Sequence, residues 1–456
     1  MKATDPGLQS VAESAALLAS GAMSSTEILE QALARASDAS GEGQRVFTQR
    51  YDERSLQEAR AWDAARGARA VPTALAGLPV SVKDLFDVAG YVTTAGSRVL
   101  ADRAPASTDA AIIARLRRAG AVIVGKTNMT EFAFSGLGLN PHFGTPKNPF
   151  ERARGRIPGG SSSGAAISVT DGMAIAAIGT DTGGSVRIPA ALCGLVGFKP
   201  TAERIPLTGS IPLSRTLDSA GPIARTVECC ALIDAVMAGD APAAPAPAEV
   251  RNLRVAVART LVWDDAEPAV ATAVERALAR LSAAGARVSD LAFAELGEIP
   301  SINASGGFSA AEAFAWHRQF LSLKRADYDP RVAVRLERGR DMSAADYLDL
   351  FDARARIQAS AARTLGDVDV WVHPTVPCTA MEIDALADDE AYFAANRLVL
   401  RNPSLVNFLD GCAISLPFHA PGNAPVGLSL VGRHGDDRRL LAIARALAPI
   451  VAARQD

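Results

Sequence analysis

Hydrophobic positions near the start of the chain recur at helical spacing. A capping-box pattern, Ser24 with Glu27 three residues later, precedes the apolar positions of 28–33. A second segment, 52–66, has the same amphipathic character and is predicted to form another helix. We therefore expect two amphipathic helices to open the fold.

The pattern changes after residue 75, where short apolar runs alternate with helical segments. Strands are predicted over 78–83, 121–124 and 174–178, and a helix over 108–118. The alternation continues to about Asp240 and implies βαβ crossovers. We predict an α/β fold with one large mixed, mostly parallel β-sheet surrounded by helices.

A Pro/Ala-rich segment, 241–249 (APAAPAPAE), follows this alternating part. Its composition is typical of a linker or a surface loop. Strands and helices resume after it, so both sides of the segment belong to the α/β pattern. The predicted strands are 254–258, 368–373 and 426–431, and the predicted helices are 267–284, 343–364 and 437 to the C-terminus.

Composition narrows the classes of function. The chain has 456 residues, of which 48% are hydrophobic and 21% charged, so it can bury a sizeable core. Lysine and arginine (47) nearly balance aspartate and glutamate (50), without a basic stripe, which argues against a nucleic-acid partner. The longest apolar runs are of strand size, well below the ~20 residues that cross a bilayer, so we expect no membrane span.

Cysteine and histidine usage argues against a disulfide scaffold and a metal centre. The five cysteines form no C-x-x-C pair, which is typical of a reduced, cytoplasmic protein. The N-terminus has no apolar stretch typical of a signal peptide, so we expect a cytoplasmic location. The five histidines are scattered, without an H-x-x-x-H motif, so we expect no metal ion.

Two motif matches fail on their structural context. Segment 120–127 (GAVIVGKT) fits the phosphate-binding pattern G-x-x-x-x-G-K-[ST], but its variable residues form a predicted strand where a loop of free amides is needed. Segment 160–164 (GSSSG) fits the G-x-S-x-G nucleophile elbow, which must follow a strand. The preceding residues, 152–159, are charged, glycine-rich and interrupted by proline, so they cannot supply that strand.

The densest chemistry lies in two segments rich in glycine and serine, 158–164 (PGGSSSG) and 179–187 (GTDTGGSVR). Glycines let a backbone turn sharply and direct successive amides at one point, which suits an oxyanion hole. The alternative is a glycine-rich turn that caps the next helix. The candidate amide donors are Thr182, Gly183, Gly184 and Ser185.

A serine nucleophile needs a base, and no histidine is nearby in the sequence. Lys83 ends an apolar strand, where burial would favour its neutral form. Arginine cannot serve, because it does not lose its proton in this pH range. The alternative role for Lys83 is a salt bridge with the adjacent Asp84.

Together these segments resemble the amidase signature family. The resemblance is strong over 75–230 and weaker at His373-Pro374 and 425–428. The segments that carry it are 78–84 (LPVSVKD), 125–129 (GKTNM), 158–164 (PGGSSSG), 179–187 (GTDTGGSVR) and 193–201 (CGLVGFKPT).

The resemblance implies a Ser-cisSer-Lys triad that hydrolyses amides without a cofactor or a metal. Matched motif by motif, the nucleophile is Ser185, the bridging serine with a cis peptide bond is Ser161, and the base is Lys83. It also implies a single domain, 1–456, with a catalytic core at 75–230. The remainder, 250–456, would carry the specificity loops.

The substrate is less closely defined. Asn128, Met129 and Phe134 are expected beside the site as substrate-binding residues, although a core role is equally open for the last two. Arg187 is either a clamp for a substrate carboxylate or a partner that pairs with Asp181.

We predict a stand-alone hydrolase for a small uncharged or partly apolar amide. The alternatives are the glutaminase subunit of a tRNA-dependent amidotransferase and a hydrolase of carboxylated ureas such as allophanate. Self-association into a homo-oligomer stays open.

Overall fold

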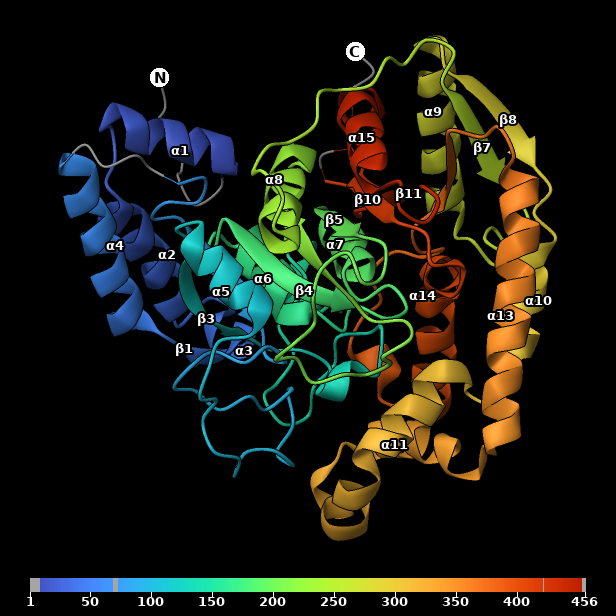
Figure 1. Cartoon of the computed structure of the whole chain (residues 1–456), viewed down its shortest axis with the longest axis horizontal. Helices are drawn as coiled ribbons and strands as arrows, with labels where there is room; N and C mark the ends of the chain where they lie inside the picture. The colour runs from blue at the N-terminus through green and yellow to red at the C-terminus, as the bar shows by residue number, and fades with distance from the viewer. Residues whose placement is uncertain (1–8, 69–72, 421, 453–456) are drawn as a thin grey trace.

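One sheet runs through the whole molecule (Figure 1). The computed structural model describes residues 9–68, 73–420 and 422–452. Within them the sheet has 11 strands in the order β1-β3-β2-β4-β6-β5-β10-β11-β9-β7-β8. The strands are β1 (Phe47–Arg50), β2 (Pro79–Lys83), β3 (Val122–Thr127), β4 (Ala176–Asp181), β5 (Val196–Lys199), β6 (Ser219–Ala224), β7 (Arg254–Ala258), β8 (Arg287–Leu291), β9 (Val370–Pro374), β10 (Ala413–Pro417) and β11 (Gly427–Val431).

The large mixed sheet is confirmed, but it is not mostly parallel. Four strand pairs are parallel, at the β3-β2-β4 and β9-β7-β8 ends of the order. Six are antiparallel, including the middle strands β6, β5, β10 and β11. The prediction read every alternation as a βαβ crossover. Instead, β5 and β6 are joined by a segment without a helix, and β10 and β11 by a short loop, so each pair runs antiparallel.

Helices cover both faces of the sheet, and the side chains of the strands alternate between two cores. In β3, Ile123 belongs to the core that includes α5, α8, α9 and α15, whereas Val122 and Val124 face a second core with α2 and α6. In β9, Val372 and Trp371 likewise point to opposite faces. Strands that are buried on both faces appear in a sequence as continuous apolar runs, and such runs allowed several of these strands to be predicted.

Figure 1 places α1, α2 and α4 at one end of the molecule and α10 and α13 at the other. The helices predicted over 52–66, 267–284 and 343–364 are present as α4, α9 and α13. Ser24 caps α2 with the predicted capping box, but a further helix, α1, precedes it. The bounds are α1 (Val11–Ser20), α2 (Ser25–Ser37), α3 (Gly43–Val46), α4 (Asp52–Gly67), α5 (Ala111–Arg118), α6 (Ser163–Thr170), α7 (Arg187–Cys193), α8 (Val227–Ala238), α9 (Pro268–Ala283), α10 (Glu295–Ile302), α11 (Gly307–Lys324), α12 (Pro330–Glu337), α13 (Ala344–Leu365), α14 (Asp389–Leu409) and α15 (Asp437–Ala452).

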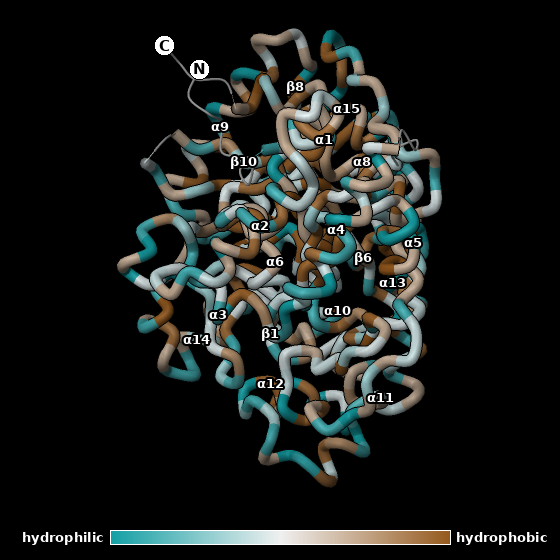
Figure 2. Tube along the Cα trace, turned by 90° about the vertical axis from the view of Figure 1, so that its left-hand side faces the viewer, coloured by the Kyte–Doolittle hydropathy of each residue, from teal (hydrophilic) through white to brown (hydrophobic). Residues whose placement is uncertain are grey.

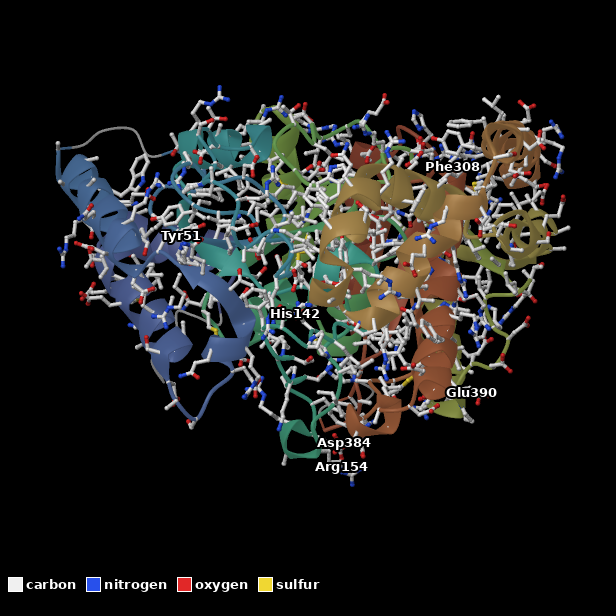
Figure 3. All side chains as sticks on the ribbon, turned by 90° about the horizontal axis from the view of Figure 1, so that it is seen from below. Tyr51, His142, Arg154, Phe308, Asp384 and Glu390 are labelled. Atoms are coloured by element: carbon white, nitrogen blue, oxygen red, sulfur yellow. The ribbon has the colours of Figure 1, made fainter. Side chains whose placement is uncertain are left out.

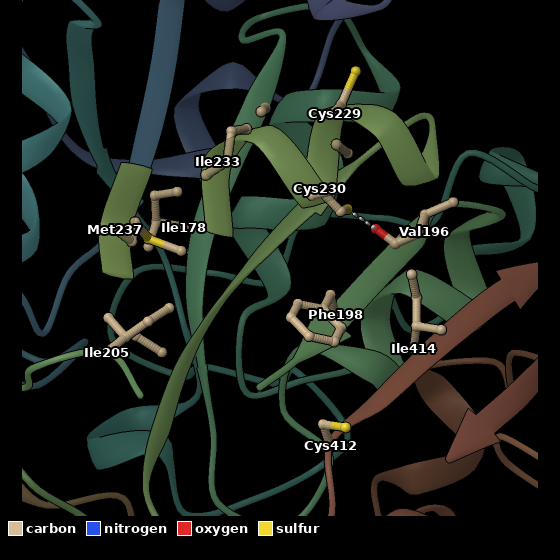
Figure 4. Close-up of a cluster of buried hydrophobic side chains, with 14 of the residues drawn as sticks. Ile178, Val196, Phe198, Ile205, Cys229, Cys230, Ile233, Met237, Cys412 and Ile414 are labelled. Atoms are coloured by element: carbon tan, nitrogen blue, oxygen red, sulfur yellow. Dashed lines mark hydrogen bonds between the residues drawn. The ribbon is translucent and has the colours of Figure 1, made fainter. Parts of the chain in front are cut away.

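The core between α8 and the middle strands is a cluster of buried hydrophobic side chains (Figure 4). Cys230 of α8 donates its thiol to the carbonyl of Val196 at 3.5 Å, and Phe198 and Ile414 pack in the same core. Figure 2, which colours the chain by hydropathy, shows mainly hydrophobic segments inside the molecule and mainly hydrophilic segments around them. All five cysteines are buried and free.

The segment 241–249 has neither helix nor strand and connects α8 to β7. Strands before and after it belong to the same sheet. The division into a catalytic core and a specificity region stays a prediction. Among the helices of the described residues, none combines the length and the apolar character needed to cross a membrane.

Candidate active site

Lys83 and Ser161 meet at the carboxyl edge of β2. Lys83 is the last residue of that strand, and its side chain is fully buried. Its Nζ donates to Ser161 Oγ at 2.6 Å and to Thr180 Oγ1 at 2.9 Å. Ser161 follows a cis peptide bond from Gly160. The structure thus joins two predicted residues that lie 78 positions apart in the sequence.

Burial lowers the pKa of Lys83 to about 7, against an opposing effect of the Asp218 and Asp181 carboxylates. Among the described residues no carboxylate lies within 4.0 Å of its amine. Asp84 instead pairs with Lys126 at 3.1 Å, so the predicted alternative, a salt bridge between Lys83 and Asp84, is not formed. The amine therefore faces two hydroxyl groups, which can accept its hydrogen bonds while it is neutral.

Ser185 lies just before α7, with 3% of its surface exposed. The amide of Ser162 donates to the carbonyl of Ser185 at 3.3 Å, so the two serine-containing segments are adjacent. Between them, in the described structure, the hydroxyls of Ser161 and Ser185 form no direct hydrogen bond. Gly184 has a φ of +119°, and a Cβ on it would lie 2.5 Å from the ring of Pro403, so glycine is required there.

A buried ion pair holds the loop before Ser185. Asp181 and Arg187 are both fully buried and form two bonds of 2.9 Å through Nε and Nη2. Asp181 also accepts the amide of Gly184 at 2.8 Å and the side-chain amide of Asn407 at 2.9 Å. Burial alone would raise the pKa of Asp181, but Arg187, with Lys199 and Asn407, outweighs it and holds that pKa well below its usual range. Arg187 is thus engaged in bracing the loop.

The bonds of Asp181 change the predicted set of amide donors. The amide of Gly184 is already used by that carboxylate, so it is not available to a ligand. The amides of Thr182, Gly183 and Ser185 have no hydrogen-bond partner among the described residues. These three groups remain candidates for an oxyanion hole.

Three residues that the sequence did not single out help to shape the site. Thr180 accepts from Lys83, and Asn407 of α14 supports Asp181. Asp218 accepts the hydroxyl of Thr182 at 2.5 Å, and burial raises its pKa to about 6. Thr180 lies within the recognised segment 179–187, but the other two lie far away in the sequence, and no motif marks them.

The predicted substrate residues differ in their surroundings. Asn128 is fully buried and donates its side-chain amide to the carbonyls of Arg45 and Gly144 at 2.8 and 2.7 Å. Met129 is fully buried in the hydrophobic core. This geometry favours structural roles for both residues. Phe134 belongs to the same core, is 5% exposed, and has the guanidinium of Arg335 4.3 Å from its ring centroid.

Leu400 of α14 lies beside the loop before Ser185, at a point that no motif predicted. Its Cδ2 would be 3.1 Å from a Cβ on Gly136 and 3.7 Å from a Cβ on Gly183. Gly136 accepts the amide of Gly160, the residue before Ser161. Leu400 therefore forms part of an apolar wall between the two serine segments.

None of the five histidines, all of which lie in the described residues, bonds to the candidate serines. His142, labelled in Figure 3, lies 2.8 Å from Glu131. His373 bonds to the carbonyl of Pro374 at 2.7 Å, and His317 to the hydroxyl of Tyr328 at 2.8 Å. The structure agrees with the rejection of both motif matches. Lys126, from the phosphate-binding match, is buried in β3, and no strand directly precedes Gly160, the first residue of the nucleophile-elbow match.

Comparison with known proteins places the chain in a family. The sequence model of the Amidase family matches residues 27–441. The chain belongs to the amidase family. A 2-amino-5-chloromuconic acid deaminase from Comamonas testosteroni is 40% identical over 416 residues, covering 88% of this chain and 89% of the relative.

Two further relatives extend the comparison. A glutamyl-tRNA(Gln) amidotransferase subunit from Thioalkalivibrio sulfidiphilus is 32% identical, and the match covers 96% of both chains. A solved amidase structure superimposes with a TM-score of 0.87 at 31% identity, covering 96% of this chain and 99% of that chain. The family and the fold predicted from the sequence are therefore confirmed, and this amidase is an enzyme that hydrolyses C–N bonds of amides.

Proposed function

We propose that this amidase transfers the acyl group of its substrate to Ser185 and then to water. Lys83, in its neutral form, accepts a proton through the hydroxyl of Ser161 while Ser185 Oγ attacks the carbonyl carbon. The same proton then passes to the departing nitrogen. The contact that carries this proposal is the 2.6 Å hydrogen bond between Lys83 Nζ and Ser161 Oγ, in surroundings that lower the pKa of the amine to about 7.

The negative oxygen of the tetrahedral intermediate would be held by the amides of Thr182, Gly183 and Ser185. Two buried carboxylates fix this loop, since Asp181 binds the amide of Gly184 and Asp218 binds the hydroxyl of Thr182. Donors that are held in place before the reaction need no reorganisation when charge develops. No step of this mechanism uses a metal or a cofactor.

The experiment that tests the roles compares Ser185→Ala, Ser161→Ala and Lys83→Arg with the wild-type enzyme. We expect Ser185→Ala and Lys83→Arg to lose several orders of magnitude in kcat/KM, because one lacks the attacking atom and the other cannot lose its proton. A Lys83→Arg enzyme with near wild-type activity would show that Lys83 is not the base. Circular dichroism of each variant separates lost chemistry from lost folding.

The preferred substrate, on the prediction from the sequence, is a small uncharged or partly apolar amide. Leu400 supports an apolar wall, whereas Met129 and Phe134 both belong to the hydrophobic core. A second candidate is an amide that carries a carboxylate, which Arg335 favours. This arginine is half-buried, has no carboxylate within 4.0 Å among the described residues, stacks on Phe134 and donates Nη1 to the carbonyl of Phe134, which leaves its other N–H groups for a ligand.

The two candidates are separated by measuring kcat/KM over a panel of amides: glutamine, an aliphatic amide, an anilide, allophanate and succinamate. Arg335→Met should lower kcat/KM for succinamate and leave the aliphatic amide unaffected if the substrate is an acid. The matched control is Arg338→Met, an exposed arginine on the following turn. The 40% identical relative, named as acting on a muconic acid, also supports the acid candidate.

We also propose that the enzyme acts in the cytoplasm without a different partner subunit. It would act there as a monomer or as a homo-oligomer. Its higher identity to the deaminase, which is not named as a subunit, than to the amidotransferase subunit supports independent activity. Five free cysteines are typical of a reducing compartment. Activity on glutamine that emerges only when a partner subunit is added would favour the amidotransferase alternative.

A further inference from the structure

A cavity of about 670 Å³ lies between α11, the first turn of α13 and the loop 212–215. Its size is within the range of sites for small organic ligands. Figure 1 shows α11 beside the lower end of α13, and Phe308 of α11, labelled in Figure 3, packs against Tyr347 of α13 with 5.9 Å between ring centroids. The triad residues are not part of the cavity lining.

Positive charge in the cavity is poorly compensated. Arg215 and Arg318 line it, are exposed, and have no carboxylate within 4.0 Å in the described part of the chain. The third lining arginine, Arg340, reaches only Glu337, at 3.5 Å, and that glutamate is not part of the lining. Arginine guanidinium groups in a concave site are well suited to bind a carboxylate through two parallel hydrogen bonds.

The one acidic residue of the lining, Glu312, forms no ion pair with these arginines within the described residues. Glu312 accepts hydrogen bonds from Ser214 Oγ at 2.6 Å, from the amide of Thr216 at 3.0 Å and from the hydroxyl of Tyr347 at 2.7 Å. The hydroxyl of Thr216 also donates to it. Its two oxygens are therefore engaged in fixing the loop, and the arginines keep their capacity for another anion.

The aromatic residues of the lining indicate what kind of ligand body the cavity would accept. Phe314, Trp316 and Tyr347 supply aromatic surface, and the guanidinium of Arg340 lies 5.8 Å from the ring centroid of Phe314. Aromatic walls beside arginines favour a planar apolar group that carries negative charge. We propose that this cavity binds a small planar carboxylate.

The cavity is linked to the loop before Ser185 by a short series of hydrogen bonds. Leu213 and Ser214, in the cavity loop, donate their amides to Asp218 at 3.0 and 3.1 Å. Asp218 in turn accepts the hydroxyl of Thr182, three residues before Ser185. The bound carboxylate is either one end of the substrate itself or a separate acid, and kinetics distinguish these sources.

The test uses binding without turnover, so it does not depend on the proposed mechanism. Benzoate, benzyl alcohol and inorganic phosphate are titrated into the Ser185→Ala protein and followed by calorimetry and by tryptophan fluorescence. We expect benzoate to bind, benzyl alcohol and phosphate to bind at least about tenfold more weakly, and Arg318→Gln with Arg215→Gln to lose about tenfold or more in benzoate affinity. Trp316→Phe should remove the fluorescence response.

The matched control is Arg276→Gln, an exposed arginine of α9 outside the cavity lining, which should bind benzoate like the parent protein. Unchanged benzoate affinity in the double variant, or equal binding of benzyl alcohol, would overturn the proposal. In the wild-type enzyme, competitive inhibition by benzoate would identify the cavity as part of the substrate site. Noncompetitive inhibition that disappears in the double variant would identify a separate acid.

Discussion

Replacing Lys83 by methionine tests the buried neutral amine through stability rather than activity. Burial gives Lys83 a pKa of about 7 in the folded enzyme. An unfolded chain has a lysine pKa of about 10.4, so between these values the unfolded state binds one more proton than the folded state. The contribution of Lys83 to stability must therefore rise with pH over this window, by about 1.4 kcal/mol per pH unit at most. Below pH 7 both states bind the proton, and the rise ends.

The methionine variant lacks this group and keeps all others. From pH 7 to pH 9 the free energy of unfolding of the wild type should gain roughly 2–3 kcal/mol relative to Lys83→Met. Asp218, with a pKa of about 6, and His317 and His373, with values of about 3, titrate below the window.

The assay is urea unfolding followed by circular dichroism at pH 7, 8 and 9. Ser185→Ala, which keeps the amine, should show the wild-type dependence on pH. Parallel curves for the wild type and Lys83→Met would show that the amine carries its proton in the folded enzyme. That result would refute the assignment of Lys83 as a neutral base.

The remaining predictions concern the site and its support. kcat/KM of the wild type should rise with pH through about 7 and then level off, as a pH–rate profile can show, because the base must be neutral. Arg187→Met should lower the free energy of unfolding by about 3–5 kcal/mol in urea titrations, because it leaves Asp181 buried and unpaired; a loss below about 1 kcal/mol would contradict the bracing role. In an amide assay, Ser161→Ala should keep a small residual rate that Ser185→Ala lacks, because relaying the proton is less critical than attacking the carbonyl carbon. Equal rates for the two variants would argue against that division of roles.

Local patterns accounted for much of the fold. Ser24 with Glu27 marked the start of α2, and the apolar run before Lys83 marked β2, because capping and burial are local in the sequence. The prediction of a mostly parallel sheet was wrong, and β5, β6 and β10 in the middle of the sheet were not predicted as strands. Whether β6 runs parallel or antiparallel to β4 depends on the path of the chain between them, which periodicity does not record.

In the site, too, local sequence motifs revealed some residues, whereas others depend on the path of the chain. Lys83, Ser161 and Ser185 lie in motifs dense enough to be recognised, and the structure brings their segments together. Asp218, directly before β6, and Asn407 of α14 act through single side chains, without a motif of their own. Only the fold reveals such partners.

The central claim, that Ser185 is the nucleophile and Lys83 its base, is tested most directly by covalent labelling. The enzyme is treated with a fluorophosphonate, and the modified residue is located by peptide mass spectrometry. We predict one label per chain, on Ser185, with loss of activity in proportion, and much slower labelling of Lys83→Arg at the same pH. Inactivation with the label on another residue, or equally fast labelling of Ser185→Ala, would contradict the account.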